Sequence, residues 1–198
     1  MRKAVMPLVF TVGLLAVWVV PADAASTSDD YGVTVNQICV SANAQLDPLE
    51  QVFEQTTNRL LGHKVSDRKF AKLSRRFERI EVRFREQFSA IFHTELDQLN
   101  QVSPAPGDES LVADWLGTRE LLLNLYDQST QLSRRILRLN VRSAKGQISF
   151  RALFREVGRI NKQSSRISAQ YLPLSGKDFD LGTQLGATSC VTDGSGLV

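Results

Sequence analysis

The sequence contains 198 residues, of which 24 are Lys or Arg and 21 are Asp or Glu, for a formal net charge of +3. This near-neutral balance does not indicate a polyanionic partner, and nucleic-acid binding is not expected. A chain of this length can form one domain with its own hydrophobic core.

The first 24 residues follow the three-part pattern of a secretory signal peptide. Arg2 and Lys3 provide a positive start, residues 4–20 are almost entirely apolar, and Ala22 and Ala24 supply the small side chains that a signal peptidase requires. We expect cleavage after Ala24, export to the cell envelope or the extracellular space, and a soluble mature chain. Because the apolar run approaches the minimum length of a membrane span, the alternative is an uncleaved anchor.

Through most of the mature chain, apolar residues recur at alternating steps of three and four, which is typical of helices with one buried stripe. The first such helix is expected over residues 34–61, with Thr34 and Gln37 forming a capping box at its start. Asp47 and Pro48 interrupt it, either as a kink or as a stop followed by a new start.

Three more helices are expected over residues 66–101, 108–142 and 149–171, separated by turns that contain proline, glycine and serine. Pro173 is expected to end the last of them, because proline cannot continue a helix without losing a hydrogen bond. The stripe of this last helix is predicted to contain Phe150, Leu153, Val157, Ile160, Ser164, Ile167 and Tyr171.

Stripes of this kind bury one another by packing together, and short connections favour an up-down-up-down order. We therefore predict an all-α four-helix bundle over residues 25–172, with long second and third helices. Residues 173–198 are rich in Gly, Ser, Thr and Asp, which favours an irregular C-terminal tail. Within this tail only Phe179, Leu181 and Leu185 are expected to dock on the bundle.

Cys39 and Cys190 are the two cysteines of the chain. An exported chain enters an oxidising compartment, where an even number of cysteines usually pairs. A bridge between them would close a loop of about 150 residues and contribute roughly 5 kcal/mol at most. The alternative is two free, buried thiols.

A basic ridge follows the predicted second helix and faces away from its apolar stripe. The ridge consists of Arg68, Lys72, Arg75, Arg76, Arg79 and Arg83. Like charges four residues apart destabilise a helix, so the ridge suggests an anion-binding face for an envelope polymer or lipid headgroups. The alternative is a solvated face that acidic residues of a neighbouring helix neutralise. Aromatic residues do not interleave the ridge, which disfavours single-stranded nucleic acid.

Recognisable patterns for a metal, a cofactor or a nucleophile are absent from the sequence. Bundles that hold two iron or manganese ions need Glu three residues before His, whereas Leu60 and Ala90 precede His63 and His93 at this spacing. We therefore expect no cofactor and no enzymatic activity. The alternative is an enzyme whose site is assembled from scattered polar residues.

Several small or polar residues lie on or beside the apolar stripes of the third and fourth helices. They are Gly117, Thr118, Ser129, Gly158 and Ser164. Such residues either line a small polar cavity, or let helices approach closely and hold a buried water.

Three short segments of the chain resemble a group of small secreted helical proteins of actinobacteria. Residues 38–44 contain a Cys-x-x-Ala-Asn motif, residues 185–190 contain Leu-Gly-x-x-x-Cys, and a Trp-Leu pair lies between them at residues 115–116. The resemblance implies a bridge between Cys39 and Cys190. It implies no activity and supplies no catalytic residues, because that group is largely uncharacterised.

These observations favour an exported, non-enzymatic binding or structural protein of the cell envelope or extracellular space. Self-association is a further hypothesis, and it predicts exposed apolar residues outside the core stripes. The candidates for such a contact are Phe92, Leu116, Leu121 and Phe154.

Overall fold

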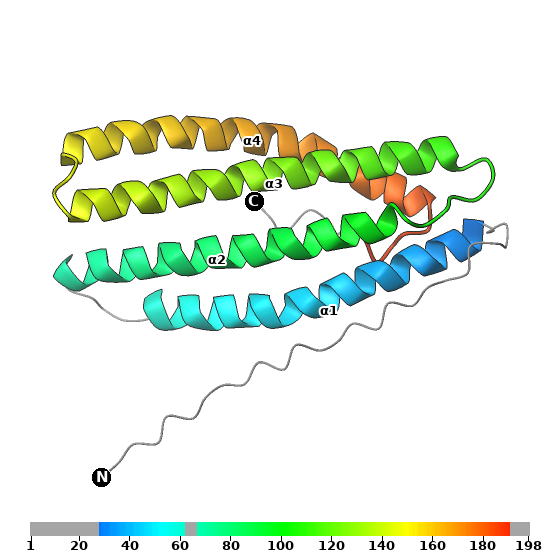
Figure 1. Cartoon of the computed structure of the whole chain (residues 1–198), viewed down its shortest axis with the longest axis horizontal. Helices are drawn as coiled ribbons and strands as arrows, with labels where there is room; N and C mark the ends of the chain where they lie inside the picture. The colour runs from blue at the N-terminus through cyan, green and yellow to red at the C-terminus, as the bar shows by residue number, and fades with distance from the viewer. Residues whose placement is uncertain (1–27, 62–66, 191–198) are drawn as a thin grey trace, which may run out of the picture.

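The computed structural model describes residues 28–61 and 67–190, without the side chains of residues 28, 60, 61, 67–72 and 74. Its four helices are α1 (Ser28–Leu61), α2 (Asp67–Leu99), α3 (Glu109–Ala144) and α4 (Phe150–Gln184) (Figure 1). The described residues contain no strand, so the prediction of an all-α four-helix bundle is confirmed. The predicted signal peptide over residues 1–24 lies outside the described residues.

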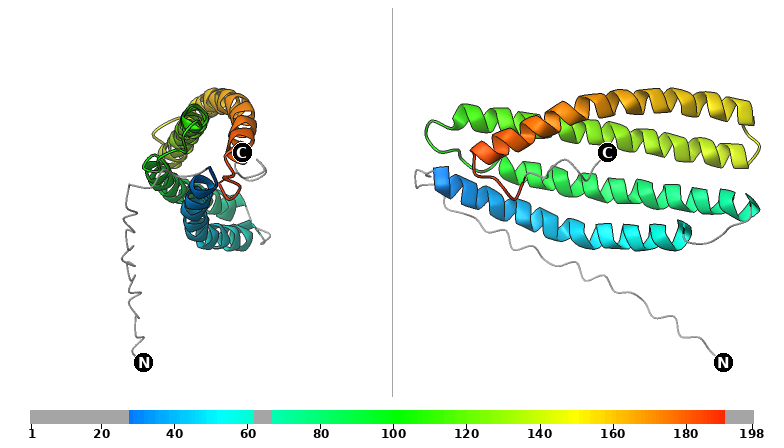
Figure 2. Two further views of the ribbon diagram at one scale, coloured as in Figure 1. Left: turned by 90° about the vertical axis from the view of Figure 1, so that its right-hand side faces the viewer. Right: turned by 180° about the vertical axis from the view of Figure 1, so that it is seen from behind.

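The four helices form a curved row that leaves the bundle open along one side. Each helix packs on the next one in the chain, α1 on α2, α2 on α3 and α3 on α4. In the described helices no Cα atom of α1 comes within 8 Å of a Cα atom of α4. The segment after α4, red in Figure 2, crosses this gap at one end of the molecule and reaches α1.

The largest hydrophobic core lies at the end of the bundle where that segment crosses. All four helices and the crossing segment contribute to it, with Tyr31, Val35, Leu99, Trp115, Leu181 and Leu185 among its buried side chains. A second, smaller cluster of Leu46, Phe88 and Tyr126 lies near the middle of the bundle. None of the helices in the described ranges has an apolar run that could cross a bilayer.

The N-terminal boundary of α1 differs from the sequence-based prediction. The helix begins at Ser28 rather than at Thr34, because the added turn buries Tyr31 in the core. The hydroxyl of Thr34 donates a hydrogen bond to the carbonyl oxygen of Asp30 at 3.0 Å, one helical turn earlier. The predicted capping box of Thr34 and Gln37 is therefore wrong.

Pro48 and Pro173 both lie inside continuous helices. α1 passes through Pro48, which excludes the predicted alternative of a stop and a new start. α4 passes through Pro173 and continues to Gln184, so the prediction that Pro173 ends the last helix is wrong. In Figure 1 the orange and red part of α4 bends toward the α1 side of the bundle.

The prediction of an irregular tail over residues 173–198 is accordingly wrong for residues 173–184. A proline in a helix interior costs about 3 kcal/mol, and this segment offsets that cost by burying Leu181 in the main core. Leu185 is also buried just after the helix, as predicted, but Phe179 is exposed rather than docked.

A tight turn connects α3 to α4 at the end of the bundle opposite the main core. Gly146 has a positive φ of 69°, a conformation that glycine adopts without strain. Ser149 caps α4, because its hydroxyl oxygen accepts a hydrogen bond from the backbone N–H of Ala152 at 3.2 Å.

Candidate functional site

A disulfide links α1 to the segment that follows α4. Cys39 and Cys190 are bonded to each other with their Cα atoms 5.0 Å apart, which excludes the alternative of two free thiols. Such a bond fits a protein of an oxidising compartment outside the cytoplasm.

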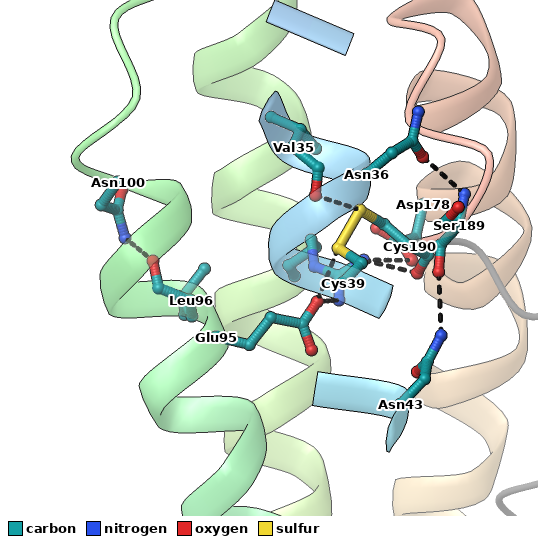
Figure 3. A network of polar contacts seen from close by, with 11 residues as sticks. Val35, Asn36, Cys39, Asn43, Glu95, Leu96, Asn100, Asp178, Ser189 and Cys190 are labelled. Atoms are coloured by element: carbon teal, nitrogen blue, oxygen red, sulfur yellow. Dashed lines mark hydrogen bonds and ion pairs between the residues drawn. A yellow bond between two sulfur atoms is a disulfide. The ribbon is translucent and has the colours of Figure 1, made fainter. Parts of the chain in front are cut away.

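Two asparagines of α1 hold the crossing segment beside the disulfide (Figure 3). Asn36 accepts a hydrogen bond from the backbone N–H of Ser189 at 2.7 Å and donates one to the carbonyl of Gly186 at 2.7 Å. Asn43 donates to the carbonyl of Ser189 at 3.1 Å. These contacts satisfy backbone groups that would otherwise be left unpaired where the chain leaves the helix.

A buried cluster of three charged side chains lies directly against the disulfide. Arg119 of α3 donates to Glu95 of α2 at 2.6 Å, and its other terminal nitrogen lies 3.5 Å from a carboxylate oxygen of Asp178 of α4. The side chains of Glu95, Arg119 and Asp178 are 2%, 9% and 13% exposed. Arg119 also donates to the carbonyl of Cys190 at 2.9 Å, so the cluster ties three helices to the crossing segment.

The disulfide and the cluster touch through Glu95, as Figure 3 shows. A carboxylate oxygen of Glu95 lies 3.1 Å from the sulfur of Cys39. Because a disulfide sulfur carries no hydrogen, this is a packing contact between oxygen and sulfur and not a hydrogen bond.

Burial raises the pKa of both acids in the cluster. Loss of hydration raises the pKa of the Glu95 carboxyl, and the positive charge of Arg119 acts against this rise. Burial likewise raises the pKa of Asp178, which Arg119 and the nearby indole N–H of Trp115 act to lower. The guanidinium of Arg119 also lies over the Trp115 ring, 5.3 Å from its centroid.

A cavity adjoins the cluster on the inner side of the bundle. The centres of water-sized molecules can occupy about 80 Å³ of it. Phe88, Phe92, Tyr126 and Tyr171 supply aromatic walls, and Glu95, Arg119 and Asp178 supply its charged lining. All four helices and Cys190 contribute to the lining, so the cavity exists only in the assembled bundle.

The cluster does not have the donors of an ordinary metal site. Cys39, Glu95 and Cys190 offer ligand atoms within 4.8 Å of one another. The two sulfurs are bonded to each other and therefore supply no thiolate, the form of cysteine that binds metal ions. His93 lies elsewhere on α2, exposed, with its Nε2 atom 2.9 Å from a carboxylate oxygen of Asp127.

The predicted basic ridge lies on α2, and its described part faces outward. Arg76, Arg79 and Arg83 are exposed and Arg75 is half-buried. None of these four forms an ion pair with another residue of the described ranges. The side chains of the other two members, Arg68 and Lys72, lie outside the description.

Charge is separated between the two ends of the bundle, on either side of the layer formed by Leu46, Phe88 and Tyr126. The half that contains the α3–α4 turn, which we call the basic end, comprises residues 46–61, 75–88 and 126–171. It holds 16 Lys or Arg against 8 Asp or Glu. The half with the disulfide, which we call the acidic end, comprises residues 28–45, 89–125 and 172–190. It contains 2 Lys or Arg and 10 Asp or Glu.

Two aromatic side chains project from the tip of the basic end. Phe150 and Phe154, on the first turn of α4, are 69% and 60% exposed and contact each other edge to face with ring centroids 4.5 Å apart. The prediction that Phe150 belongs to the buried stripe is therefore wrong. Arg151 and Arg155 are exposed beside them and form no ion pair with a described residue.

The hydroxyl-bearing residues of the predicted polar seam lie outside the lining of this cavity. Thr118, Ser129 and Ser164 do not line the cavity. The hydroxyl of Thr118 donates to the carbonyl of Asp114 within its own helix at 2.8 Å. Gly117 and Gly158 are exposed with open space around them, so they do not mediate close helix approach.

The residues of the buried cluster were not identified from the sequence. The burial of Glu95 could have been inferred from its spacing. It lies seven residues after Phe88 and four before Leu99, and both of these are buried on the stripe of α2. Arg119 similarly stands four residues after the fully buried Trp115. Asp178 lies in the segment that was predicted to be irregular, so its helical position could not be inferred.

Of the residues predicted to support self-association, Leu121 and Phe154 are exposed, whereas Phe92 and Leu116 pack against the two cores.

No protein-family model, curated protein or solved structure matches this chain.

Proposed function

We propose that this protein is an exported, non-enzymatic binding protein that attaches to an anionic membrane surface through its basic end. The observation that carries this proposal is the pair Phe150 and Phe154, which are exposed at the tip of the basic end. This end contains 16 basic residues and 8 acidic residues. Export is supported by the leader-like sequence and by the disulfide.

Charge and apolar surface act together in this kind of attachment. A Lys or Arg near an anionic lipid surface contributes about 1 kcal/mol, and full burial of a phenylalanine side chain contributes about 2 kcal/mol. Aromatic rings with basic neighbours therefore insert among lipid headgroups while the arginines remain at the phosphates.

The exposed aromatic pair favours a membrane over a soluble anionic polymer. A polymer would be held by the basic residues alone, and exposed phenylalanines would add little to its binding. The ridge on α2 belongs to the same basic end, so it supports this proposal as an additional source of positive charge.

Co-sedimentation with lipid vesicles tests the proposal. We expect the protein to bind vesicles that contain phosphatidylglycerol and not vesicles of phosphatidylcholine alone. Raising the ionic strength from about 0.1 M to about 1 M shortens the screening length from about 10 Å to about 3 Å and should release much of the bound protein. A sample without vesicles controls for self-association between the acidic and basic ends.

Variants of the tip separate insertion from simple charge attraction. Phe150→Ser/Phe154→Ser should lower the partition coefficient on anionic vesicles about tenfold or more, since it removes apolar contact without changing charge. The matched control is Val33→Ser/Val40→Ser, which changes two comparably exposed side chains of α1 at the acidic end. Arg151→Glu/Arg155→Glu should reduce binding further.

Equal binding of neutral and anionic vesicles would contradict the proposal. The proposal would also be contradicted if Phe150→Ser/Phe154→Ser bound anionic vesicles as well as the wild type and also bound dextran sulfate tightly. This second result would instead support the predicted alternative of an anionic polymer as the partner.

A further inference from the structure

The buried charge cluster at the acidic end is electrically unbalanced. Among the residues that line the cavity, Glu95 and Asp178 carry negative charge and only Arg119 carries positive charge. Arg119 is already engaged with Glu95 at 2.6 Å and with the carbonyl of Cys190 at 2.9 Å. Its contact with Asp178 is longer, at 3.5 Å, so Asp178 is the acid whose charge is less well compensated.

Other described cations do not supply the missing charge. Lys177, the neighbour of Asp178 in sequence, pairs with Asp114 on the surface at 2.6 Å. Arg85 pairs with Glu81 at 3.0 Å, and its guanidinium lies over the Tyr126 ring, 5.9 Å from the ring centroid. A buried carboxylate without a close counter-charge is unfavourable, so the site favours an additional positive group.

The cavity beside Asp178 has walls that suit an organic cation. Phe88, Phe92, Tyr126 and Tyr171 line it, and the faces of aromatic rings attract positive charge. Burial raises the pKa of both tyrosines, so their hydroxyl groups are neutral at ordinary pH. Aromatic faces combined with a carboxylate are the usual means by which proteins hold alkylated ammonium groups.

The size of the cavity and its surroundings also agree with a small guest. A single water needs roughly 10–15 Å³ on this measure of volume, and the cavity offers about 80 Å³. Its lining includes Asn43 of α1 and Tyr171, Ser175 and Asp178 of α4.

We propose that this cavity binds a small organic cation with an alkylated ammonium group, held by the Asp178 carboxylate and the surrounding aromatic rings. An anion would meet two carboxylates against one guanidinium and is disfavoured. A metal ion is disfavoured too, because the sulfurs form a disulfide and leave only the carboxylates as strong ligands. The proposal does not depend on membrane attachment, which involves Phe150 and Phe154, residues that do not line the cavity.

Calorimetric titration of the purified protein, with its disulfide intact, tests this proposal with choline as the probe. Its neutral isostere 3,3-dimethyl-1-butanol has nearly the same shape without the charge. We expect choline to bind at least about tenfold more tightly than the isostere. Equal affinities, or no detectable binding of choline, would overturn the proposal.

Two substitutions on α4 locate the site. Asp178→Asn should weaken choline binding about tenfold and leave binding of the isostere unchanged. The matched control is Asp180→Asn, an exposed acid two residues away, which should bind choline like the wild type. Choline binding that is equal in wild type, Asp178→Asn and Asp180→Asn would place the ligand elsewhere and overturn the assignment.

The aromatic wall provides a test that does not change any charge. Phe92→Leu keeps an apolar side chain at a half-buried position but removes a ring face from the cavity. We expect it to weaken choline several-fold more than the isostere. An equal effect on both probes would overturn the role of the rings, and this test remains informative if Asp178→Asn does not fold.

Discussion

At the scale of single residues, the most unusual feature is a pair of buried acids that share one arginine. Glu95 and Asp178 come from different helices and meet Arg119 next to the disulfide. Burial favours the uncharged form of a carboxyl group, whereas the guanidinium favours the charged form. For both acids burial has the larger effect, so the pKa of each is raised.

The raised pKa of Asp178 predicts how stability depends on pH. Between its ordinary value of 3.8 and its raised value, the folded state binds more protons than the unfolded state. Stability is therefore highest below this window and declines as the pH rises through it. We expect the free energy of unfolding of Asp178→Asn, measured in urea between about pH 4 and pH 7, to decline less steeply than that of the wild type.

Asp180→Asn is the control for this measurement, because Asp180 is exposed on the same helix. Its pH profile should match that of the wild type. A profile of Asp178→Asn as steep as the wild-type profile would show that ionisation of Asp178 does not oppose folding.

At the scale of elements, α4 is the helix whose extent depends most on tertiary contacts. Its last turns follow Pro173 and contain glycine, serine and aspartate, which are poor helix formers. They remain helical because Leu181 enters the main core and Asp178 reaches Arg119. Packing therefore outweighs local preference in this segment.

Substitution of the apolar residues beyond Pro173 tests this explanation. Leu181→Ala and Leu185→Ala should each lower the free energy of unfolding by about 2–4 kcal/mol, because each leaves a cavity in the main core. Leu172→Ala, at an exposed position of the same helix, should change it by no more than about 0.5 kcal/mol. Chemical denaturation measures all three, and equal small effects would show that the segment does not contribute to the core.

At the scale of the whole molecule, the bundle is open along one side and is closed at one end by a covalent bond. In the described helices no Cα atom of α1 comes within 8 Å of one of α4, and the segment after α4 connects to α1 through two asparagines and the disulfide. The two ends also differ in charge, with the disulfide at the acidic end and the α3–α4 turn at the basic end. The two proposed binding sites are therefore separate, since the cavity is lined by neither Phe150 nor Phe154.

Removal of the disulfide should destabilise the whole fold. The bridge joins residues 151 positions apart, so it restricts the unfolded chain strongly. Cys39→Ala/Cys190→Ala should lower the free energy of unfolding by about 2–5 kcal/mol. Reductant should cause a similar loss in the wild type and none in the double variant, and unchanged stability of that variant would contradict this role.

Periodic apolar residues were sufficient to predict the number of helices, their order and the all-α class. This information is local, since steps of three and four place side chains such as Phe77, Phe84 and Phe88 on one face of any α-helix. The two cysteines and their pairing were equally readable, because two cysteines permit only one bridge. The outward position of Arg76, Arg79 and Arg83 followed from the same periodicity.

Only the tertiary structure determined where helices end and which polar residues meet. The helical state of residues 173–184 depends on a core assembled from distant parts of the chain, so the local sequence wrongly predicts a helix end at Pro173. Glu95, Arg119 and Asp178 meet because three helices converge at the disulfide, and periodicity within one helix carries no information about its neighbours. The exposure of Phe150 could not be predicted for the same reason, because periodicity within α4 does not show which part of its stripe a neighbouring helix covers.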